Sequence, residues 1–386
     1  MPWNIEFTAS IEHIGRENWA SLCACDYPFL SYDFLAALET SGCTSARSGW
    51  QPHHAIIKDD NRIVGLMPLY QKTHSYGEYV FDWAWADAYF RHGLDYYPKL
   101  VTAIPFTPAT GPRLCLAAGF DETTVLPILI KALREELAAI GGSSWHCLFP
   151  TKDQSNQLAK LGISQRLSCQ FHWLNRGYQS FDDFLATFSS RKRKNLKKER
   201  RRIAEQGIEL ITKTGSDITS DEWRRFYYFY HFTYFKRSGR HGYLSEAFFL
   251  TLADTMPENV VMVIARQHNE MVAASLFFQD RDTLYGRYWG CSQEFEFLHF
   301  EACYYQGIEY AIEKGLQRFD PGAQGEHKIQ RGFTPVPTWS NHWIAHPDFR
   351  SAIDNFLIQE AAGTAEYIEQ AKTLLPFKSI FLATRD

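Results

Sequence analysis

The sequence predicts an α+β protein with two similarly built domains and a C-terminal helix. Its 386 residues exceed the roughly 100–200 residues of one typical domain. Apolar residues make up 45% of the chain and charged residues 22%, as in a globular protein with a substantial core. The same order of elements is predicted twice: helices, three antiparallel strands, a helix and a further strand. We therefore expect domains over residues 1–175 and 176–346, and a helical extension over 347–386.

The first domain is predicted to begin with helices and to end with a long strand. Helices are expected over 11–22, 31–41, 97–104, 125–140 and 154–161, and strands over 53–59, 62–74, 79–86, 113–117, 144–149 and 165–174. The helix over 125–140 has the clearest pattern. Its apolar residues recur three and four positions apart, between an N-cap residue at Asp121 and a glycine pair at 141–142.

The second domain repeats this order with different residues. Helices are expected over 180–206, 221–236, 245–254 and 300–314, and strands over 208–213, 260–266, 271–279, 283–290, 318–321 and 339–345. A last helix is predicted over 349–375, where Gly363 weakens the pattern near the middle.

Cysteine usage and missing motifs narrow the function classes. The eight cysteines are scattered without a CxxC pair, so we expect reduced thiols and no zinc or other metal. No GxGxxG, P-loop, GxSxG or HExxH motif is present, which argues against dehydrogenases, ATPases, serine hydrolases and zinc proteases. No apolar run could span a membrane and no signal peptide is visible, so we expect a cytoplasmic protein of undetermined oligomeric state.

Three blocks resemble a bacterial FemAB-like family of predicted N-acyltransferases, described as acting in peptidoglycan biosynthesis or recognition. They are Asp82–Tyr89, Tyr96–Pro108 and Gly322–Phe333. The segments Phe184–Lys198 and Gly307–Gly322 are similar to the FemABX aminoacyl transferases. The resemblance implies two tandem GNAT-like domains that transfer an acyl or aminoacyl group to an amine. The donor is then acyl-CoA or aminoacyl-tRNA. The alternative is a module of the same fold that recognises peptidoglycan or a peptide without catalysis.

The resemblance also suggests where the donor binds. In GNAT folds the donor pyrophosphate lies at the N-terminus of the helix that here begins near residue 299. A helix N-terminus favours anions and developing oxyanions. The usual Gly-rich loop is replaced by residues 294–300, which leaves both donors open. Glu301, His299 and His327 are candidates for the general base. The alternative for Glu301 is a carboxylate that only stabilises the first helical turn.

Polar residues gather in the block 322–333. Besides His327, it contains Gln324, Glu326, Lys328 and Arg331, which we expect to bind substrate; the two cations could clamp an anionic group. The alternative is a polar loop held by internal hydrogen bonds.

A third cluster is expected to bind the acceptor amine and to face the donor site across a cleft between the domains. Its members are Asp82, Trp85, Asp87, Tyr89, His92, Tyr97 and Lys99. Carboxylates attract an ammonium group and aromatic rings cover apolar parts of a ligand. The alternative is a strand whose tryptophans fill the core.

Residues 191–202 contain nine Lys or Arg in twelve positions. One interpretation is a phosphate-binding surface for tRNA. The other is a solvated helix face.

Overall fold

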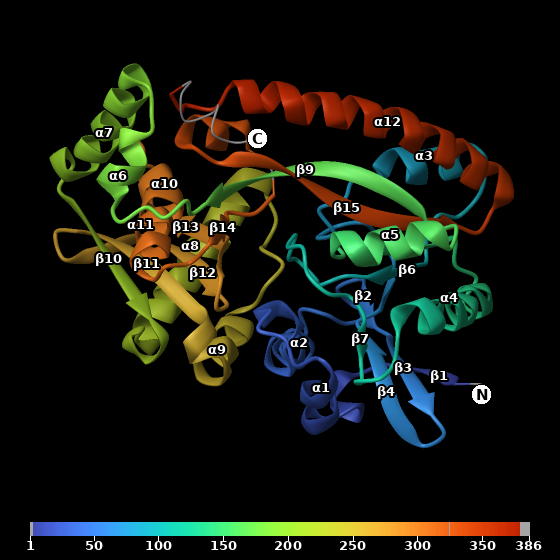
Figure 1. The fold of residues 1–386 in the computed structure, drawn as a ribbon. Coiled ribbons are helices and arrows are strands. Elements are labelled where there is room, and N and C mark those ends of the chain that lie inside the picture. The colour runs from blue at the N-terminus through green and yellow to red at the C-terminus, as the bar shows by residue number, and fades with distance from the viewer. Residues whose placement is uncertain (1–2, 324, 379–386) are drawn as a thin grey trace. The chain divides into compact units, whose positions relative to one another are not determined.

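The computed structural model describes residues 3–323 and 325–378, which form two compact units (Figure 1). Unit 1 contains the chain up to Cys169 together with Pro337–Glu366, and unit 2 contains Gln170–Val336 together with the chain from Tyr367 onward. Each unit therefore includes a segment from the C-terminal part of the sequence. The predicted boundaries follow the chain in order, and they stay a prediction.

Unit 1 combines two sheets with helices. Its elements are β1 (Asn4–Thr8), α1 (Arg16–Leu22), α2 (Tyr32–Thr40), β2 (Trp50–Pro52), β3 (His54–Asp59), β4 (Arg62–Met67), β5 (Tyr70–Lys72), α3 (Trp83–Arg91), β6 (Lys99–Thr102), β7 (Cys115–Leu116), α4 (Glu122–Ala139), β8 (Ser144–Leu148) and α5 (Lys152–Lys160). Strands β1, β3, β4 and β7 form one antiparallel sheet, which is blue in Figure 1 except for β7. In the second sheet, β6 pairs with β8 in parallel and with β5 antiparallel.

Two predictions in unit 1 are wrong. The strand expected over 79–86 is a loop followed by helix α3. Trp85 and Tyr89 are four residues apart and pack into one apolar cluster. The apolar residues of this segment therefore have the spacing of a helix and not the alternation of a strand. The short helix expected over 97–104 is strand β6, whose residues are all buried. Pro98 also disfavours a helix there, because the residue before a proline avoids the helical region.

Unit 2 contains one sheet and the remaining helices. Its elements are α6 (Phe181–Ala186), α7 (Ser190–Glu205), β10 (Ile208–Thr214), α8 (Ser220–Ser238), α9 (Glu246–Thr255), β11 (Val260–Gln267), β12 (Glu270–Gln279), β13 (Thr283–Cys291), α10 (Leu298–Phe300), α11 (Gln306–Glu313) and β14 (Arg318–Asp320). Two strands pass from one unit to the other, β9 (Ser164–Leu174) and β15 (Thr334–Ile344), as does the last helix, α12 (Pro347–Thr373).

The sheet of unit 2 has one parallel pair. Strands β10 to β13 pair antiparallel in chain order, whereas β13 and β14 pair in parallel over only three residues each. Strand β13 then continues to Cys291 while β14 ends at Asp320. A bulge at Arg287 interrupts the pairing of β13 with β12. Helix α8 crosses β13 so closely that a Cβ atom on Gly290 would lie 2.2 Å from the carbonyl carbon of Phe229.

Two predicted helices of unit 2 are divided in the structure. The basic helix expected over 180–206 is α6 and α7, separated by a segment in which Phe188 is completely buried and Ser189 is extended. The helix expected over 300–314 begins as α10, continues as a π-helical turn over Glu301–Tyr305, and ends as α11. Such a turn contains an extra residue and often marks a functional site.

The prediction that all eight cysteines are reduced is also wrong. Cys23 and Cys115 form a disulfide, although 92 residues separate them in sequence. It joins the end of α1 to β7, a contact that only the tertiary structure creates. Within residues 3–323 and 325–378, no helix is long and apolar enough to cross a membrane.

Candidate functional site

A cleft of about 480 Å³ opens in unit 2 where β13 ends and α10 begins. Aromatic side chains make up much of its wall, and the end of helix α8 forms one side. The lining residues are Phe232, Thr233, Lys236, Arg237, Trp289, Cys291, Ser292, Gln293, Glu294, Phe295, Phe297, Leu298, His299 and Phe300. This donor cleft, as we call it below, contains one of the residues predicted from the sequence, His299.

The donor cleft favours an anion. Lys236 and Arg237 lie in the last turn of α8, and Lys236 pairs with Glu294 at 2.8 Å. Within the described part of the chain, Arg237 has no hydrogen bond or ion pair, so its guanidinium is available. The first turn of α10 also directs backbone N–H groups toward its N-terminal end, although that of Leu298 already donates to the carbonyl of Phe295 at 3.3 Å. Sequence analysis did not identify Arg237, because nothing in the chain distinguishes it from other exposed arginines.

His299 is uncharged at neutral pH. Burial lowers the pKa of its imidazole to about 3, and His327 and Arg237 lower it further through their positive charge. The ring packs edge-on against Trp289 and Tyr304, with ring centroids 5.5 and 5.4 Å apart. Neither ring nitrogen of His299 has a hydrogen bond within the described residues. A neutral imidazole that lines a cleft can accept a proton.

His327 lies beside His299, with 6.4 Å between the ring centroids. Its Nε2 atom is 2.9 Å from the hydroxyl oxygen of Tyr304. Burial lowers the pKa of His327, and the nearby Arg331 and Lys328 add to that effect. The structure thus brings together two of the three predicted base candidates, although they come from segments nearly thirty positions apart in sequence.

Glu301 is held in a separate network of charges. Its carboxylate is buried and accepts hydrogen bonds from Arg200, the shortest at 2.8 Å, and from Gln306 at 2.8 Å. Arg200 also donates to Glu309 at 2.7 Å. The network joins α7 to the π-helical turn and lines a second, more open cleft of about 800 Å³. Glu301 is therefore placed to orient Arg200 and the basic helix.

The predicted anion clamp has internal partners. Arg331 pairs with Glu199 at 2.9 Å, and its guanidinium carbon is 3.4 Å from the centroid of the Phe300 ring. Lys328 is 2% exposed, and its ammonium donates to the backbone carbonyl of Gly322 at 2.7 Å. Burial lowers the pKa of Lys328 to about 8. Both cations hold the 322–333 loop in shape.

Two further residues of this loop were predicted to bind substrate. Glu326 accepts a hydrogen bond from the hydroxyl of Tyr367 at 2.8 Å. Gln324 lies outside the described residues. The alternative of a loop held by internal hydrogen bonds fits the contact of Lys328 with Gly322, whereas Glu326 and Arg331 are bonded to Tyr367 and Glu199 outside the loop.

A buried ion pair lies where β13 and β14 part. Arg287, at the bulge of β13, donates to Asp320 at 2.8 Å, and both side chains are 2% exposed. His172 lies 3.6 Å from the same carboxylate. Burial would raise the pKa of Asp320, but Arg287 and His172 outweigh that effect and hold the pKa well below its usual range. The pair fixes the end of β14, from which the 322–333 loop departs.

Unit 1 contains the second charged cluster. The ammonium of Lys99, completely buried, donates to Asp82 at 2.5 Å, to Glu78 at 2.8 Å and to Ser75 at 2.8 Å. The Ser75 hydroxyl is 2.9 Å from that of Tyr97. The structure therefore brings Asp82, Tyr97 and Lys99 together. Burial raises the pKa of Glu78 to about 7, because Lys99 offsets only part of the desolvation.

Two residues of this cluster were missed by sequence analysis, Lys72 and Glu78. Lys72 is buried over the ring of Trp50, 3.7 Å from its centroid, and burial lowers its pKa to about 6. Its ammonium is 4.0 Å from Glu78. A signal was present, since Lys72 and Lys99 both lie within apolar strand segments where a lysine needs a partner.

The other predicted acceptor residues lie apart from this cluster. Trp85 and Tyr89 pack in an apolar core with Ile344. Asp87 is exposed and pairs with Arg91 at 2.6 Å. A ring nitrogen of His92 is 2.8 Å from the carbonyl oxygen of Ala88. The core-filling alternative therefore fits the environment of Trp85.

Comparisons with known proteins identify a family and several similar solved structures. A family model described as peptidoglycan biosynthesis/recognition, FemAB-like, matches residues 10–379. Among solved structures, FemX has 12% identity over 84% of this chain and 94% of its own, with a TM-score of 0.48. A tandem GNAT protein from the clavulanic acid biosynthesis pathway has 12% identity over 89% and 99%, with a TM-score of 0.48. No curated protein matches the sequence.

A third structure has a higher TM-score. It is a domain from Agrobacterium fabrum named as the C-terminal domain (DUF2156) of a lysylphosphatidylglycerol synthetase, with 10% identity over 80% of this chain and 88% of its own and a TM-score of 0.51. At such identities the likeness concerns the fold alone. The predicted fold class, α+β with two GNAT-like units and a C-terminal helix, is confirmed.

Proposed function

The chain belongs to the FemAB-like family, and from that premise we propose that it is an N-acyltransferase. It transfers an acyl or aminoacyl group from a thioester or ester donor to an amine. The observation that supports this most strongly is the donor cleft of unit 2, where a neutral imidazole, an available guanidinium and the beginning of a helix lie together. A cleft of this kind offers both an anion-binding end and a proton acceptor.

His299 and the beginning of α10 each have a role in the proposed reaction. The amine nitrogen attacks the donor carbonyl, and His299 accepts the proton that the nitrogen loses. The N–H groups at the beginning of α10 stabilise the negative charge on the carbonyl oxygen. The C–S or C–O bond of the donor then breaks, and the leaving thiolate or alkoxide takes up a proton. His299, which holds the proton taken from the amine, supplies it.

Donor binding should also change the pKa of the proposed base, His299. Arg237 contributes to the low pKa of His299. A donor phosphate beside Arg237 would offset its positive charge and raise the pKa of the imidazole, although burial, the largest cause of the low pKa, would remain. The base then becomes stronger only when the donor is in place.

We assign Glu301 as a positioning residue and the Asp82–Lys99 cluster as part of the acceptor site. Glu301 acts through Arg200, which it binds with two oxygens. For the acceptor, the family description points to a peptidoglycan peptide. The cluster offers polar partners for its amine, the carboxylates of Asp82 and Glu78, which face Lys99 and Lys72.

Helix α7 bears on whether the donor is aminoacyl-tRNA or acyl-CoA. Arg191, Lys194 and Lys198 are exposed and spaced three and four positions apart, so they share one face of the helix. Within the described residues, none of the three has an ion pair. This face can contact an RNA backbone.

If the donor is a tRNA, its binding should depend strongly on the salt concentration. Binding of alanyl-tRNA should weaken by roughly tenfold or more between 50 and 200 mM salt, because each phosphate contact releases counterions. Replacing Arg191, Lys194 and Lys198 with Gln should reduce that slope. Acetyl-CoA binding should respond far less to salt and not at all to the triple substitution. Filter binding and calorimetry provide the two measurements.

Binding of a wall peptide without any donor binding would favour the recognition module and contradict the transferase.

A further inference from the structure

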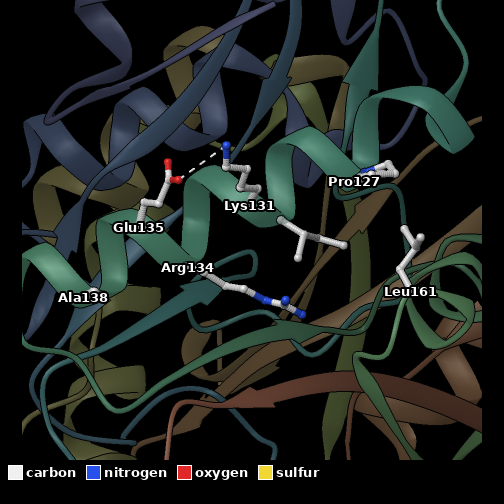
Figure 2. A pocket seen from close by; sticks show the side chains of 7 residues that line it. Pro127, Lys131, Arg134, Glu135, Ala138 and Leu161 are labelled. Atoms are coloured by element: carbon white, nitrogen blue, oxygen red, sulfur yellow. Dashed lines mark ion pairs between the residues drawn. The ribbon is translucent and has the colours of Figure 1, made fainter.

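A third cleft, of about 500 Å³, lies on the outer face of α4 in unit 1 (Figure 2). It is separate from the charged cluster of that unit. The residues that line it are Pro127, Ile130, Lys131, Arg134, Glu135, Ala138 and Leu161. Four of these seven side chains are apolar, and Ile130 is also part of the buried core beneath.

Arg134, which lines this groove, lies near a second guanidinium group, that of Arg350. The guanidinium carbon of Arg134 is 4.9 Å from the ring centroid of Trp343, and that of Arg350 is also 4.9 Å from it. The two cations therefore share one indole ring. Burial and the charge of Arg350 lower the pKa of Arg134, which is the direction expected when like charges lie close together.

No carboxylate balances this charge within residues 3–323 and 325–378. Arg134 has no hydrogen bond or ion pair there, and Arg350 donates to two backbone carbonyls at the end of β15, at 2.7 and 2.9 Å. The acidic residue of the groove, Glu135, pairs with Lys131 at 3.8 Å. Figure 2 shows that this pair extends from α4 on the side opposite to Arg134. The groove beside Arg134 thus has a positive end without a protein counter-charge.

The rest of the groove is apolar. Pro127, Ile130 and Leu161 line it away from the guanidinium, and Figure 2 shows Arg134 and Leu161 on the same side of α4. A small inorganic anion would satisfy Arg134 but leave this wall in contact with water. An apolar molecule without a charge would cover the wall but leave Arg134 unpaired.

We propose that this groove binds a single-chain amphiphile with an anionic head, either a carboxylate or a phosphate monoester. The head group pairs with Arg134, whose planar fork suits both anions. The hydrocarbon chain lies along Pro127, Ile130 and Leu161. The site is independent of the transferase proposed above, because no residue of the donor cleft or of the Asp82–Lys99 cluster contributes to it.

Calorimetric titration with dodecanoate and with dodecyl phosphate tests the proposal on the full chain. We expect one site per chain, and about fourfold weaker binding for each methylene removed from the ligand. The variant Arg134→Gln should bind at least tenfold more weakly, and Arg134→Lys should bind with intermediate affinity. The matched control Arg47→Gln, which changes an exposed arginine of the same unit outside the groove, should bind within twofold of the unchanged chain.

The relative affinities of the two ligands distinguish a fatty acid site from a lipid phosphate site. Equal binding by Arg134→Gln would overturn the proposal, as would equal binding of dodecanol, which lacks the charge, or of hexanoate, which lacks most of the chain. Arg134 is exposed on a helix, so its replacement should leave the fold unchanged; circular dichroism and the melting temperature verify this. Variants with Leu161→Ser, which alters only the apolar wall, should lose affinity for dodecanoate more than for hexanoate.

Discussion

Replacing His299 with Ala should lower acyl transfer about 10²–10⁴-fold while the protein remains folded. The reason is that a neutral imidazole in the donor cleft accepts the proton of the attacking amine. Transfer is measured as release of CoA from acetyl-CoA, or of deacylated tRNA from alanyl-tRNA, with a lysine-containing peptidoglycan peptide as the acceptor. The matched control is His231→Ala, which removes a histidine of the same unit outside the cleft.

The pH dependence separates a base from a structural residue. The pKa of about 3 predicts that kcat/KM, which reports the free enzyme, stays level down to acidic pH. The bound donor should raise that pKa, so kcat should fall at a higher pH than kcat/KM does. Full activity of His299→Ala would contradict the assignment. Loss of activity in His327→Ala with none in His299→Ala would move the role to the neighbouring imidazole.

Replacing Lys99 with Met should destabilise the protein by about 3–5 kcal/mol. Lys99 is completely buried and is the shared partner of Asp82 and Glu78, so its loss leaves the buried Asp82 without a cation and Glu78 with only Lys72, 4.0 Å away. Urea denaturation measures the change in the free energy of unfolding. The control Lys131→Met changes an exposed residue and should alter the stability by about 0.5 kcal/mol or less.

A second substitution checks the cause of that loss. Adding Asp82→Asn to Lys99→Met should restore part of the stability, because an amide is less costly to bury than an unpaired carboxylate. A loss below about 1 kcal/mol for Lys99→Met would mean that the cluster is open to water and that the ion pairs contribute little.

The sequence predicted those helices and strands correctly whose apolar side chains recur at the spacing of only one kind of element. Helix α4 was predicted because its apolar residues, such as Leu126 and Leu133, recur at helical spacing and fill one core. The segment around Trp85 failed because aromatic residues there fit both a strand and a helix, and only the apolar cluster with Tyr89 decides between them. The π-helical turn at Glu301–Tyr305 has no local signal, since it depends on tertiary contacts such as the bond from Ser275 to the carbonyl of Ala302 at 2.7 Å.

The sequence indicated which kinds of residue belong to the site, but not which residues they pair with. The resemblance pointed to His299 and His327, and the structure brings them together. It also pointed to Glu301 and Arg331, but the sequence did not show that Arg200 and Glu199 pair with them. The availability of Arg237 depends on which acidic residues fold near it. Spacing along the chain carries no such information.

The most direct measurement for the account is donor affinity in the variant Arg237→Gln. Binding of acetyl-CoA and of alanyl-tRNA is compared with that of the unchanged chain and of Arg224→Gln, which changes an arginine at the other end of the same helix. If the donor cleft holds the donor phosphates, Arg237→Gln should bind the true donor about tenfold more weakly or worse, and Arg224→Gln should bind it normally. Unchanged donor affinity in Arg237→Gln would contradict the placement of the donor in this cleft.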